Sequence, residues 1–260
     1  MVSKVTVESL QRKKNRNLKI VMMTACSYSM AKLIDAPGVV EMLLVSDRLG
    51  PLSLGYDSPL PVTLEEMLHH AKAVSRAKTR AMVVAQMPYL TYEISTSEAA
   101  RNAGRLYKEG LADAVMLRGG RAVAGSIAAI LEANVPVVGH LGFFSAAHPF
   151  LEKGSHRRVH DGQALEDARR LEEAGCFAIF LEHTPRSLAG RISRALKIPV
   201  IGFGSGPLCD GQMLSTEEML GLAPSGRGMR EIKVYAALGR AVMGAARLFA
   251  REVKKGEYLR

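Results

Sequence analysis

The sequence contains few cysteines, and none of them are spaced as metal-binding pairs usually are. The three are Cys26, Cys176 and Cys209, an odd number with no C-x-x-C spacing. A disulfide framework or a structural zinc site needs paired thiols. The pattern is typical of reduced thiols in a cytoplasmic compartment, so we expect a cytoplasmic protein.

Long apolar runs are also missing. Stretches such as Cys176–Leu181 are broken by a charge, a glycine or a proline after fewer than ten residues, whereas a membrane-spanning helix needs about 20. The first residues lack the continuous apolar segment of a signal peptide. With 48% hydrophobic and 23% charged residues, the composition is that of a globular chain and not of a disordered or collagen-like one. We therefore expect no membrane partner.

The net charge of +10 is unevenly distributed along the 260 residues. Residues 1–20 carry six Lys or Arg against one Glu, and residues 227–260 carry nine against three acidic residues. The remaining residues have a net charge of −1. Basic termini are typical of solvated tails and helix faces, so the total charge does not predict a nucleic-acid partner.

Short apolar segments rich in β-branched residues alternate with longer amphipathic ones. The predicted strands are Lys19–Thr24, Met42–Ser46, Ala81–Gln86, Ala114–Leu117, Val135–His140, Phe177–Glu182 and Pro199–Phe203. The predicted helices are Ser29–Ile34, Leu64–Ser75, Ser97–Glu109, Ser126–Glu132, Gln163–Glu173 and Arg186–Leu196. Thr63 and Ser97 precede acidic residues and are predicted helix N-caps. An eighth unit, in Gly211–Leu222, is only weakly indicated.

Near-continuous apolar strands separated by helices predict a parallel sheet covered on both faces. Two architectures fit, a doubly wound open sheet and a (β/α)8 TIM barrel. The Gly-rich turn Gly202–Gly206 favours the open sheet, but it lacks the acid-terminated second strand of a dinucleotide fingerprint. Seven or eight units in 260 residues favour the barrel. We predict one domain, 1–260, with residues 1–18 as a basic lead-in.

In such barrels the active site lies at the C-terminal ends of the strands. Polar residues occupy this position after six of the seven predicted strands: Asp47, Arg48, Gln86, Arg118, His140, Glu182 and the turn Gly202–Gly206. Any one of them could be a structural polar residue. Together they predict a polar pocket at one mouth of the barrel.

The other histidines are weaker candidates. His69 and His70 fall inside a predicted helix and are not expected to bind a ligand. His148, His156 and His160 lie with Lys153, Arg157 and Arg158 between the fifth strand and the next helix. That segment is either a solvated loop or a lid that contacts an anionic substrate or cofactor.

Several longer strings are similar to those of a known family. They are Leu54–Thr63, Gly139–Gly142, Gly202–Gly206, Asp210–Met213 and Glu218–Leu222. In this order, from about Lys19 to Glu257, they resemble the ketopantoate hydroxymethyltransferase (3-methyl-2-oxobutanoate hydroxymethyltransferase) family.

The resemblance implies a TIM barrel that transfers a one-carbon unit from 5,10-methylenetetrahydrofolate to the α-keto acid 3-methyl-2-oxobutanoate. In that family Mg²⁺ holds the keto acid and stabilises its enolate. A glutamate at the end of the sixth strand takes the proton next to the carbonyl. The resemblance implies that Glu182 is this base and that His140 contacts the carbonyl side of the substrate.

The metal half of the implied site is altered. Of the family's Asp-Ser pair, Asp47 is kept as the only family metal ligand and Arg48 replaces the serine. Gln86 replaces a second aspartate, and Met116 and Arg118 replace a lysine and a glutamate. The family residues sum to −2, which Mg²⁺ brings to about zero, whereas Asp47, Arg48 and Arg118 sum to +1. Mg²⁺ takes several oxygen ligands, carboxylates foremost, and here it would have one carboxylate with two guanidiniums beside it, so we do not expect it at this position.

Two interpretations of the altered site remain open. In the first, Arg48 and Arg118 replace the metal and hold a keto-acid carboxylate or enolate with their forked donors, and Asp47, Gln86 and Met116 line the substrate site. In the second, Arg118 pairs with Asp47, and the chain is a non-catalytic or neofunctionalised paralogue that acts through assembly or on another keto acid. The retained His140 and Glu182 favour the first.

The C-terminal segment is predicted to be an amphipathic helix. Apolar residues recur at helical spacing between Met229 and Lys254. In the family that this chain resembles, the C-terminal helix packs across the subunits of a decamer. We therefore predict an oligomerisation helix in residues 229–260 and a homodecamer.

Overall fold

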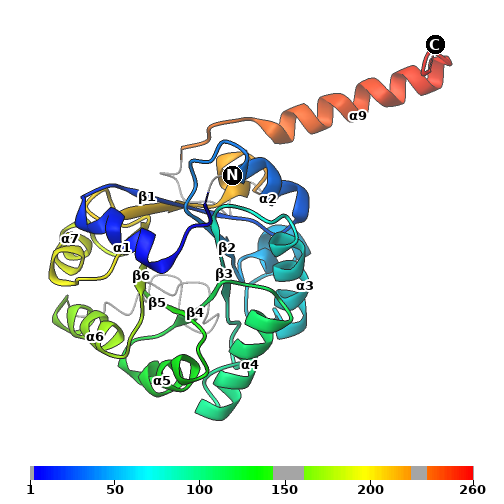
Figure 1. Ribbon diagram of the computed structural model, residues 1–260. Coiled ribbons are helices and arrows are strands. Elements are labelled where there is room, and N and C mark those ends of the chain that lie inside the picture. Colours follow the sequence, from blue (N-terminus) through cyan, green and yellow to red (C-terminus); the bar gives the residue numbers. More distant parts are fainter. Residues whose placement is uncertain (1–2, 143–160, 224–232, 260) are drawn as a thin grey trace. The chain divides into compact units, whose positions relative to one another are not determined.

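The computed structural model describes residues 3–142, 161–223 and 233–259. Its eight strands follow one another around a closed barrel, and the neighbouring strands from β1 to β8 pair in parallel. Figure 1 shows helices surrounding this barrel. The predicted (β/α)8 TIM barrel is confirmed, and the open sheet is excluded.

The bounds of the elements are as follows. The strands are β1 Ile20–Thr24, β2 Met42–Val45, β3 Met82–Gln86, β4 Ala114–Arg118, β5 Val137–Gly142, β6 Ala178–Glu182, β7 Val200–Phe203 and β8 Gly211–Leu214. The α-helices are α1 Val7–Asn15, α2 Tyr28–Asp35, α3 Leu64–Ser75, α4 Thr96–Lys108, α5 Ala124–Glu132, α6 Asp161–Glu173, α7 Arg186–Ala195, α8 Thr216–Met219 and α9 Leu238–Lys255. Short π and 3₁₀ turns occupy Gly50–Leu54 and Arg121–Val123.

All seven predicted strands and six predicted helices are confirmed, with ends that differ from the prediction by at most two residues. The eighth strand lies at the start of the weakly indicated segment. Thr63 caps α3 as predicted, in a capping box with Glu66. The predicted cap Ser97 is wrong, because Ser97 lies inside α4 and Ser95 accepts the hydrogen bond from the Glu98 N–H. A cap side chain accepts a hydrogen bond from an N–H two or three residues further along the chain. Ser95 stands three residues before Glu98 and can do so, whereas Ser97 stands directly before it and cannot.

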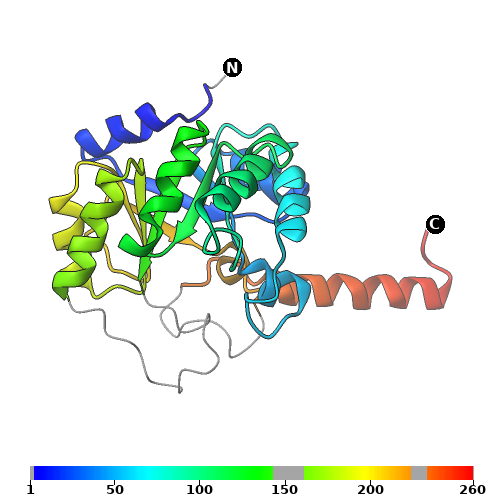
Figure 2. The ribbon, with the colours of Figure 1, turned by 90° about the horizontal axis from the view of Figure 1, so that it is seen from below.

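The N-terminal segment, which was predicted as a basic lead-in, packs onto the barrel through one helix. It contains α1, which begins with a capping box between Thr6 and Ser9 and buries Leu10 completely. Lys13 pairs with Glu41 at 2.9 Å and Lys14 with Asp210 at 2.6 Å. Glu41 and Asp210 precede β2 and β8, so α1 is fixed across the N-terminal end of the barrel, where Figure 2 shows it.

The chain divides into two compact units, Met1–Met213 and Leu214–Arg260. In the second unit, α9 begins at Leu238 and not at the predicted Met229. Residues 229–232 lie outside the described part of the chain, and 233–237 are not helical. The backbone N–H groups of Tyr235 and Leu238 donate to carbonyls of Met219 and Leu220. These bonds to α8 replace the i to i−4 bonds of a longer helix.

Strand register brings polar residues of neighbouring strands together at the C-terminal end of the barrel. Arg118 of β4 pairs in register with His140 of β5, and Glu182 of β6 pairs with Phe203 of β7. Below this level most strand side chains are apolar and buried, including all of β2, with exposed exceptions at Val21 of β1 and Gln212 of β8. The apolar strands therefore form a rigid base for a polar mouth.

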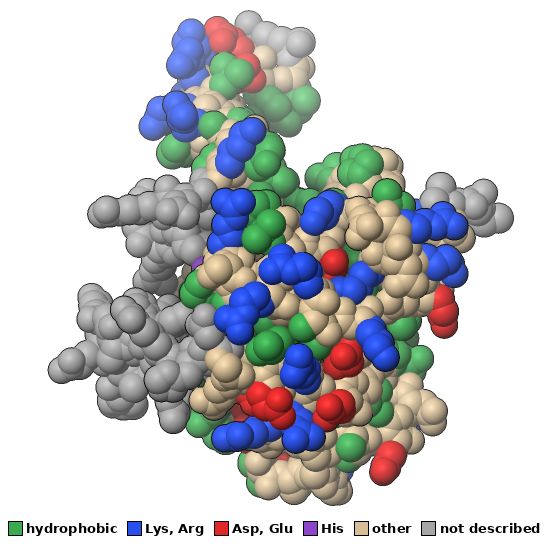
Figure 3. Space-filling model, turned by 90° about the vertical axis from the view of Figure 1, so that its left-hand side faces the viewer, with side chains coloured by type: hydrophobic (Ala, Val, Ile, Leu, Met, Phe, Trp, Pro, Cys, Tyr) green, Lys and Arg blue, Asp and Glu red, His purple; other side chains and the backbone are tan. Residues whose placement is uncertain are grey.

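Basic residues lie on the outer helices. Figure 3 shows Lys and Arg side chains over the face that carries α1 and α7, with Asp and Glu side chains among them. Arg12, Arg191 and Arg194 on these helices are exposed, as expected of solvated helix faces. Within the described ranges, no helix is long and apolar enough to cross a membrane.

Candidate active site

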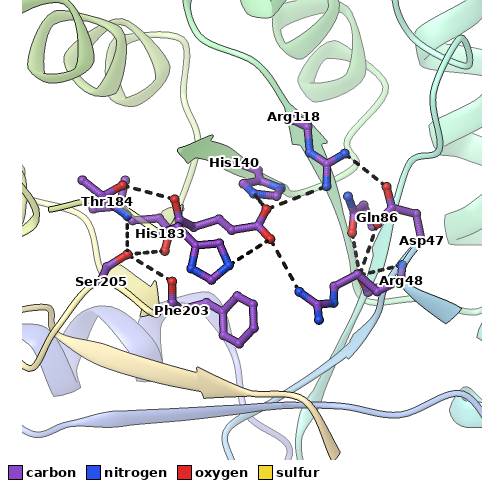
Figure 4. A network of polar contacts seen from close by, with 12 residues as sticks. Asp47, Arg48, Gln86, Arg118, His140, His183, Thr184, Phe203 and Ser205 are labelled. Carbon is purple, nitrogen blue, oxygen red and sulfur yellow. Dashed lines mark hydrogen bonds and ion pairs between the residues drawn. The ribbon is translucent and has the colours of Figure 1, made fainter. Parts of the chain in front are cut away.

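The predicted polar residues meet at the mouth of the barrel. Gln86, Arg118 and Glu182 end their strands, His140 lies within β5, and Asp47 follows β2. In Figure 4, Arg118 and His140 point toward the centre of the site, and Asp47 lies beside Arg118. The barrel thus brings together residues that are up to 135 positions apart, from Asp47 to Glu182.

Glu182 is the centre of the contact network. His140 Nε2 lies 3.1 Å from its Oε2 atom, and Arg118 Nη2 lies 4.0 Å from the same oxygen. On the other side, Arg48 Nη1 is 3.7 Å and His183 Nε2 is 3.9 Å from Oε1. The Glu182 side chain is only 13% exposed. Each carboxylate oxygen therefore faces one guanidinium and one imidazole.

These contacts set the charge of Glu182. Burial alone would raise its pKa, but the hydrogen bond from His140 and the positive charges of Arg118 and Arg48 outweigh burial and lower the pKa to about 2. Glu182 is therefore ionised at neutral pH and accepts hydrogen bonds. It is a weak base as long as both guanidiniums act on it.

His140 is buried against the edge of the Phe180 ring, with the ring centroids 4.7 Å apart. Burial lowers its pKa, and the neighbouring Glu182 only partly opposes this. The imidazole is therefore neutral at pH 7. Because ionised Glu182 only accepts hydrogen bonds, the proton of His140 lies on Nε2.

The two arginines are held differently. Arg118 Nη1 lies 3.3 Å from Oδ2 of Asp47, a carboxylate that is itself buried. Burial would lower the pKa of Arg118, but Asp47 and Glu182 raise it, so the guanidinium is fully charged. Arg48 stacks over the Phe203 ring, 5.1 Å from its centroid. Both arginines aim donors at the space around Glu182.

Ser46 joins the residues of β2 and β3. Its Oγ donates to Oε1 of Gln86 at 2.9 Å and accepts from the backbone N–H of Arg48 at 3.2 Å. Gln86 is 1% exposed, and its Nε2 has no hydrogen-bond partner among the described residues. Sequence reasoning missed Ser46, although it stands directly before the predicted Asp47.

The glycine turn supports the end of β6. Ser205 Oγ donates to the carbonyl of Leu181 at 2.9 Å and accepts from the Thr184 N–H at 3.0 Å. Gly204 and Gly206 have φ values of 60° and 76° and allow the tight turn around this serine. The predicted turn thus lies at the site but acts through Ser205. In the sequence, the position of Ser205 between Gly204 and Gly206 was the signal that could have identified this residue.

The remaining candidates lie in different places. Met116 is fully buried in β4 and has no exposed surface at the mouth of the barrel. His69 is exposed on α3, and His70 Nδ1 contacts the carbonyl oxygen of Cys26 at 2.7 Å. The loop histidines His148, His156 and His160, with Lys153, Arg157 and Arg158, lie outside the described residues. Sequence reasoning missed His183, although it directly follows the predicted Glu182.

The donor set does not fit a magnesium ion at the family position. Asp47 is engaged by the Arg118 guanidinium, and the amide oxygen of Gln86 already accepts from Ser46. Among the residues that the structure describes, no group of three His, Cys, Asp or Glu side chains could hold a metal. A hard dication at Asp47 would have one carboxylate ligand and two guanidiniums nearby.

Comparison with known sequences agrees with the resemblance. The family model described as ketopantoate hydroxymethyltransferase matches residues 4–259. The chain belongs to this family. It is 45% identical to the 3-methyl-2-oxobutanoate hydroxymethyltransferase of Moorella thermoacetica, over 98% of this chain and 96% of that protein. It is 43% identical to the protein of that name from Ignicoccus hospitalis, over 99% and 97% of the two chains. The relatives therefore match the whole barrel.

Solved structures with low sequence identity share the family fold. A phosphonopyruvate hydrolase complex with oxalate and Mg²⁺ aligns with a TM-score of 0.63 at 15% identity, over 97% of this chain and 88% of that one. A 2,3-dimethylmalate lyase aligns with a TM-score of 0.61 at 17% identity, over 96% and 88%. At these identities the likeness concerns the barrel fold alone.

Proposed function

We propose that this chain transfers a hydroxymethyl group to an α-keto acid, 3-methyl-2-oxobutanoate, with 5,10-methylenetetrahydrofolate as the one-carbon donor. The product, ketopantoate, leads to pantothenate, and the reaction takes place in the cytoplasm. Family membership supports the reaction type, and the names of the relatives support the substrate. The observation that carries the proposal is Glu182, ionised and buried between His140 and two arginines.

Glu182 is the base in the proposed mechanism. Its carboxylate takes the proton from the carbon next to the keto group, and the electron pair of that C–H bond forms the enolate. The neutral imidazole of His140 fixes the carboxylate through Nε2. The enolate carbon then forms a bond to the methylene carbon of the donor. The C–N bonds of that carbon break to release tetrahydrofolate, and water supplies the oxygen of the new hydroxymethyl group.

Arg48 and Arg118 take the place of a metal ion. One guanidinium holds the substrate carboxylate, and the other stabilises the negative charge that develops on the keto oxygen. Gln86 lines the same half of the site and offers its buried Nε2 as a further donor. Asp47 keeps Arg118 in place, and Met116 packs in the apolar core of β4 and supports the site without contacting the substrate.

Substrate binding also activates the base in this mechanism. Before binding, both guanidiniums act on Glu182 at 3.7 and 4.0 Å. A substrate carboxylate competes for the same donors and weakens their hold on Glu182. The carboxylate of Glu182 then becomes more basic when there is a proton to take.

The assembly proposed for the chain is a homodecamer that uses α9. This helix has no buried residue, and its apolar side chains Val242, Leu248, Phe249 and Val253 are about half exposed. An apolar helix face in water favours a partner surface. The proposed single functional domain, residues 1–260, includes this helix.

Proton exchange tests the proposed function. The Cβ proton of 3-methyl-2-oxobutanoate is followed by NMR in D₂O, with and without EDTA or added Mg²⁺. We expect enzyme-dependent exchange that EDTA leaves unchanged and that falls by about 10² to 10⁴-fold in Glu182→Gln. Hydroxymethyl transfer from 5,10-methylenetetrahydrofolate is measured in parallel.

Glu132→Gln is the matched control, since Glu132 is exposed at the end of α5. It should keep the exchange rate of the unmodified protein. Absence of exchange in the unmodified protein, together with no keto-acid binding in calorimetry, would contradict the proposal and favour a non-catalytic paralogue. Exchange that EDTA abolishes would contradict the role of the arginines.

A further inference from the structure

Two histidines flank Glu182, and only one of them reaches the surface. His140 Nε2 lies 3.1 Å from Oε2, and its side chain is 2% exposed. His183 Nε2 lies 3.9 Å from Oε1, and its side chain is 26% exposed. Figure 4 shows the His183 ring at the centre of the site, on the side of Arg48 and Phe203.

The fold holds His183 in this place. Its φ of 48° lies in the left-handed region, which few residues adopt and where histidine is found more often than most. Its N–H donates to the Phe203 carbonyl at 2.8 Å, and the next N–H, of Thr184, donates to Ser205 Oγ at 3.0 Å. The ring also packs against the Phe203 ring, 5.1 Å between centroids. A strained residue fixed on both sides at a site is often functional.

A buried base needs a route by which its proton leaves. In the proposed mechanism Glu182 becomes a carboxylic acid after each abstraction and must return to the carboxylate. The guanidiniums of Arg48 and Arg118 cannot accept a proton. His140 already has its proton on Nε2, the atom that faces Glu182, and it is buried.

We infer that His183 carries the proton from Glu182 to solvent, as a residue of the catalytic machinery. This inference rests on the proposed function. The substrate C–H bond breaks, its electron pair forms the enolate, and the proton passes to a carboxylate oxygen of Glu182. The O–H bond then breaks, the proton moves to the unprotonated nitrogen of the His183 imidazole, and the imidazolium releases it to water. Glu182 and His183 thus end in the protonation states in which they started, and the tetrahydrofolate nitrogens released by hydroxymethyl transfer take their protons from water.

The geometry and charge of His183 suit this role. A distance of 3.9 Å is spanned by one bridging water or closes through a small rotation of the carboxyl group. Burial lowers the pKa of His183, Glu182 opposes this, and Arg48 adds to it. The imidazole is therefore neutral at pH 7 and able to accept a proton.

His183→Asn in the full chain tests the inference, because asparagine tolerates the left-handed backbone and has no titratable group. Exchange of the Cβ proton of 3-methyl-2-oxobutanoate in D₂O should slow by at least about tenfold. Added imidazole should restore it in proportion to its concentration until saturation, and should leave the unmodified protein unaffected. His69→Asn, on the exposed face of α3, is the control and should keep the exchange rate.

The outcomes separate the inference from the proposed function. Unchanged exchange in His183→Asn overturns the proton-carrier role, and so does slowed exchange that no imidazole concentration restores, because the role is then structural. Both results leave Glu182 as the base. Absence of exchange in the unmodified protein overturns the proposed function itself and the inference with it.

Discussion

The mouth of the barrel has two halves that are built differently. The base half consists of His140 on β5, Glu182 at the end of β6 and His183 directly after it. The guanidinium half consists of Asp47, Arg48, Gln86 and Arg118, from β2 to β4. The base half keeps both residues that the family resemblance implies, whereas in the guanidinium half only Asp47 is kept.

The halves also differ in what holds them. Backbone hydrogen bonds fix the base half, through the Phe203 carbonyl and Ser205 Oγ. Ion pairs fix the guanidinium half, chiefly Arg118 with Asp47. Because each strand of a barrel contributes its C-terminal residues separately, one half can change its charge while the other keeps its geometry.

Removing a charge from the guanidinium half should produce the largest effect on stability. Arg118→Met leaves the buried carboxylate of Asp47 without its counter-ion. We expect a loss of about 3 kcal/mol in the free energy of unfolding, near the low end for buried pairs, because the guanidinium is 19% exposed. Denaturation in urea measures this loss.

Arg105→Met provides the matched control. Arg105 on α4 pairs with Glu65 and Glu109 at 3.0 Å on the surface, where such pairs contribute below about 1 kcal/mol. An Arg118→Met variant no less stable than Arg105→Met would show that the guanidinium half does not depend on this ion pair. Asp47→Asn together with Arg118→Met should recover part of the loss.

Converting the guanidinium half to the family's residues should bring back a metal response. The combined variant is Arg48→Ser, Gln86→Asp, Met116→Lys and Arg118→Glu. We expect proton exchange to become Mg²⁺-dependent, with at least about tenfold stimulation, since the metal then has carboxylate ligands. Calorimetry should detect Mg²⁺ binding to this variant. Equal Mg²⁺ binding by the unmodified protein would contradict the charge argument.

A smaller effect links the two halves through Arg48. Arg48→Ser removes one positive charge from beside Glu182, so the pKa of Glu182 should rise from about 2 towards its usual value. Because the pKa of Glu182 in the folded state lies below the usual value of 4.5, the ionised carboxylate stabilises the fold at pH values above 4.5. This stabilisation is lost as the pH falls towards 2. In Arg48→Ser the contribution is smaller at neutral pH, and its loss ends at a higher pH.

NMR titration of the Glu182 carboxyl carbon measures this shift, with Glu182→Gln to assign the signal. The acid limb of the exchange rate should move to higher pH in Arg48→Ser. Arg101→Ser, exposed on α4, should leave both unchanged. An unaltered titration in Arg48→Ser would mean that the two halves are electrostatically independent.

The barrel was largely predictable, and its exceptions have local causes. Apolar strands and capped helices such as α3 have a clear hydrophobic periodicity, so their bounds can be predicted from the sequence. The helix α1 carries only sparse apolar residues, of which Leu10 is buried. Its position depends on ion pairs with distant residues such as Asp210, which no local pattern reveals.

The site was predictable as a set of residues but not as a network. The rule for strand ends selected Arg118, His140 and Glu182. The same rule could not show that Arg118 contacts both Asp47 and Glu182, because that depends on side-chain direction across the barrel. His183 was missed because its importance comes from a left-handed backbone and a contact with Glu182.

The helix α1 has a consequence for how the chain folds. Lys14 reaches Asp210 Oδ2 and the Ser193 carbonyl, 196 and 179 residues further along the sequence. During synthesis from the N-terminus, these partners leave the ribosome long after α1. The first helix made therefore docks late, and such distant contacts slow folding. Closure of the barrel, and not formation of α1, should then be the rate-limiting step of folding.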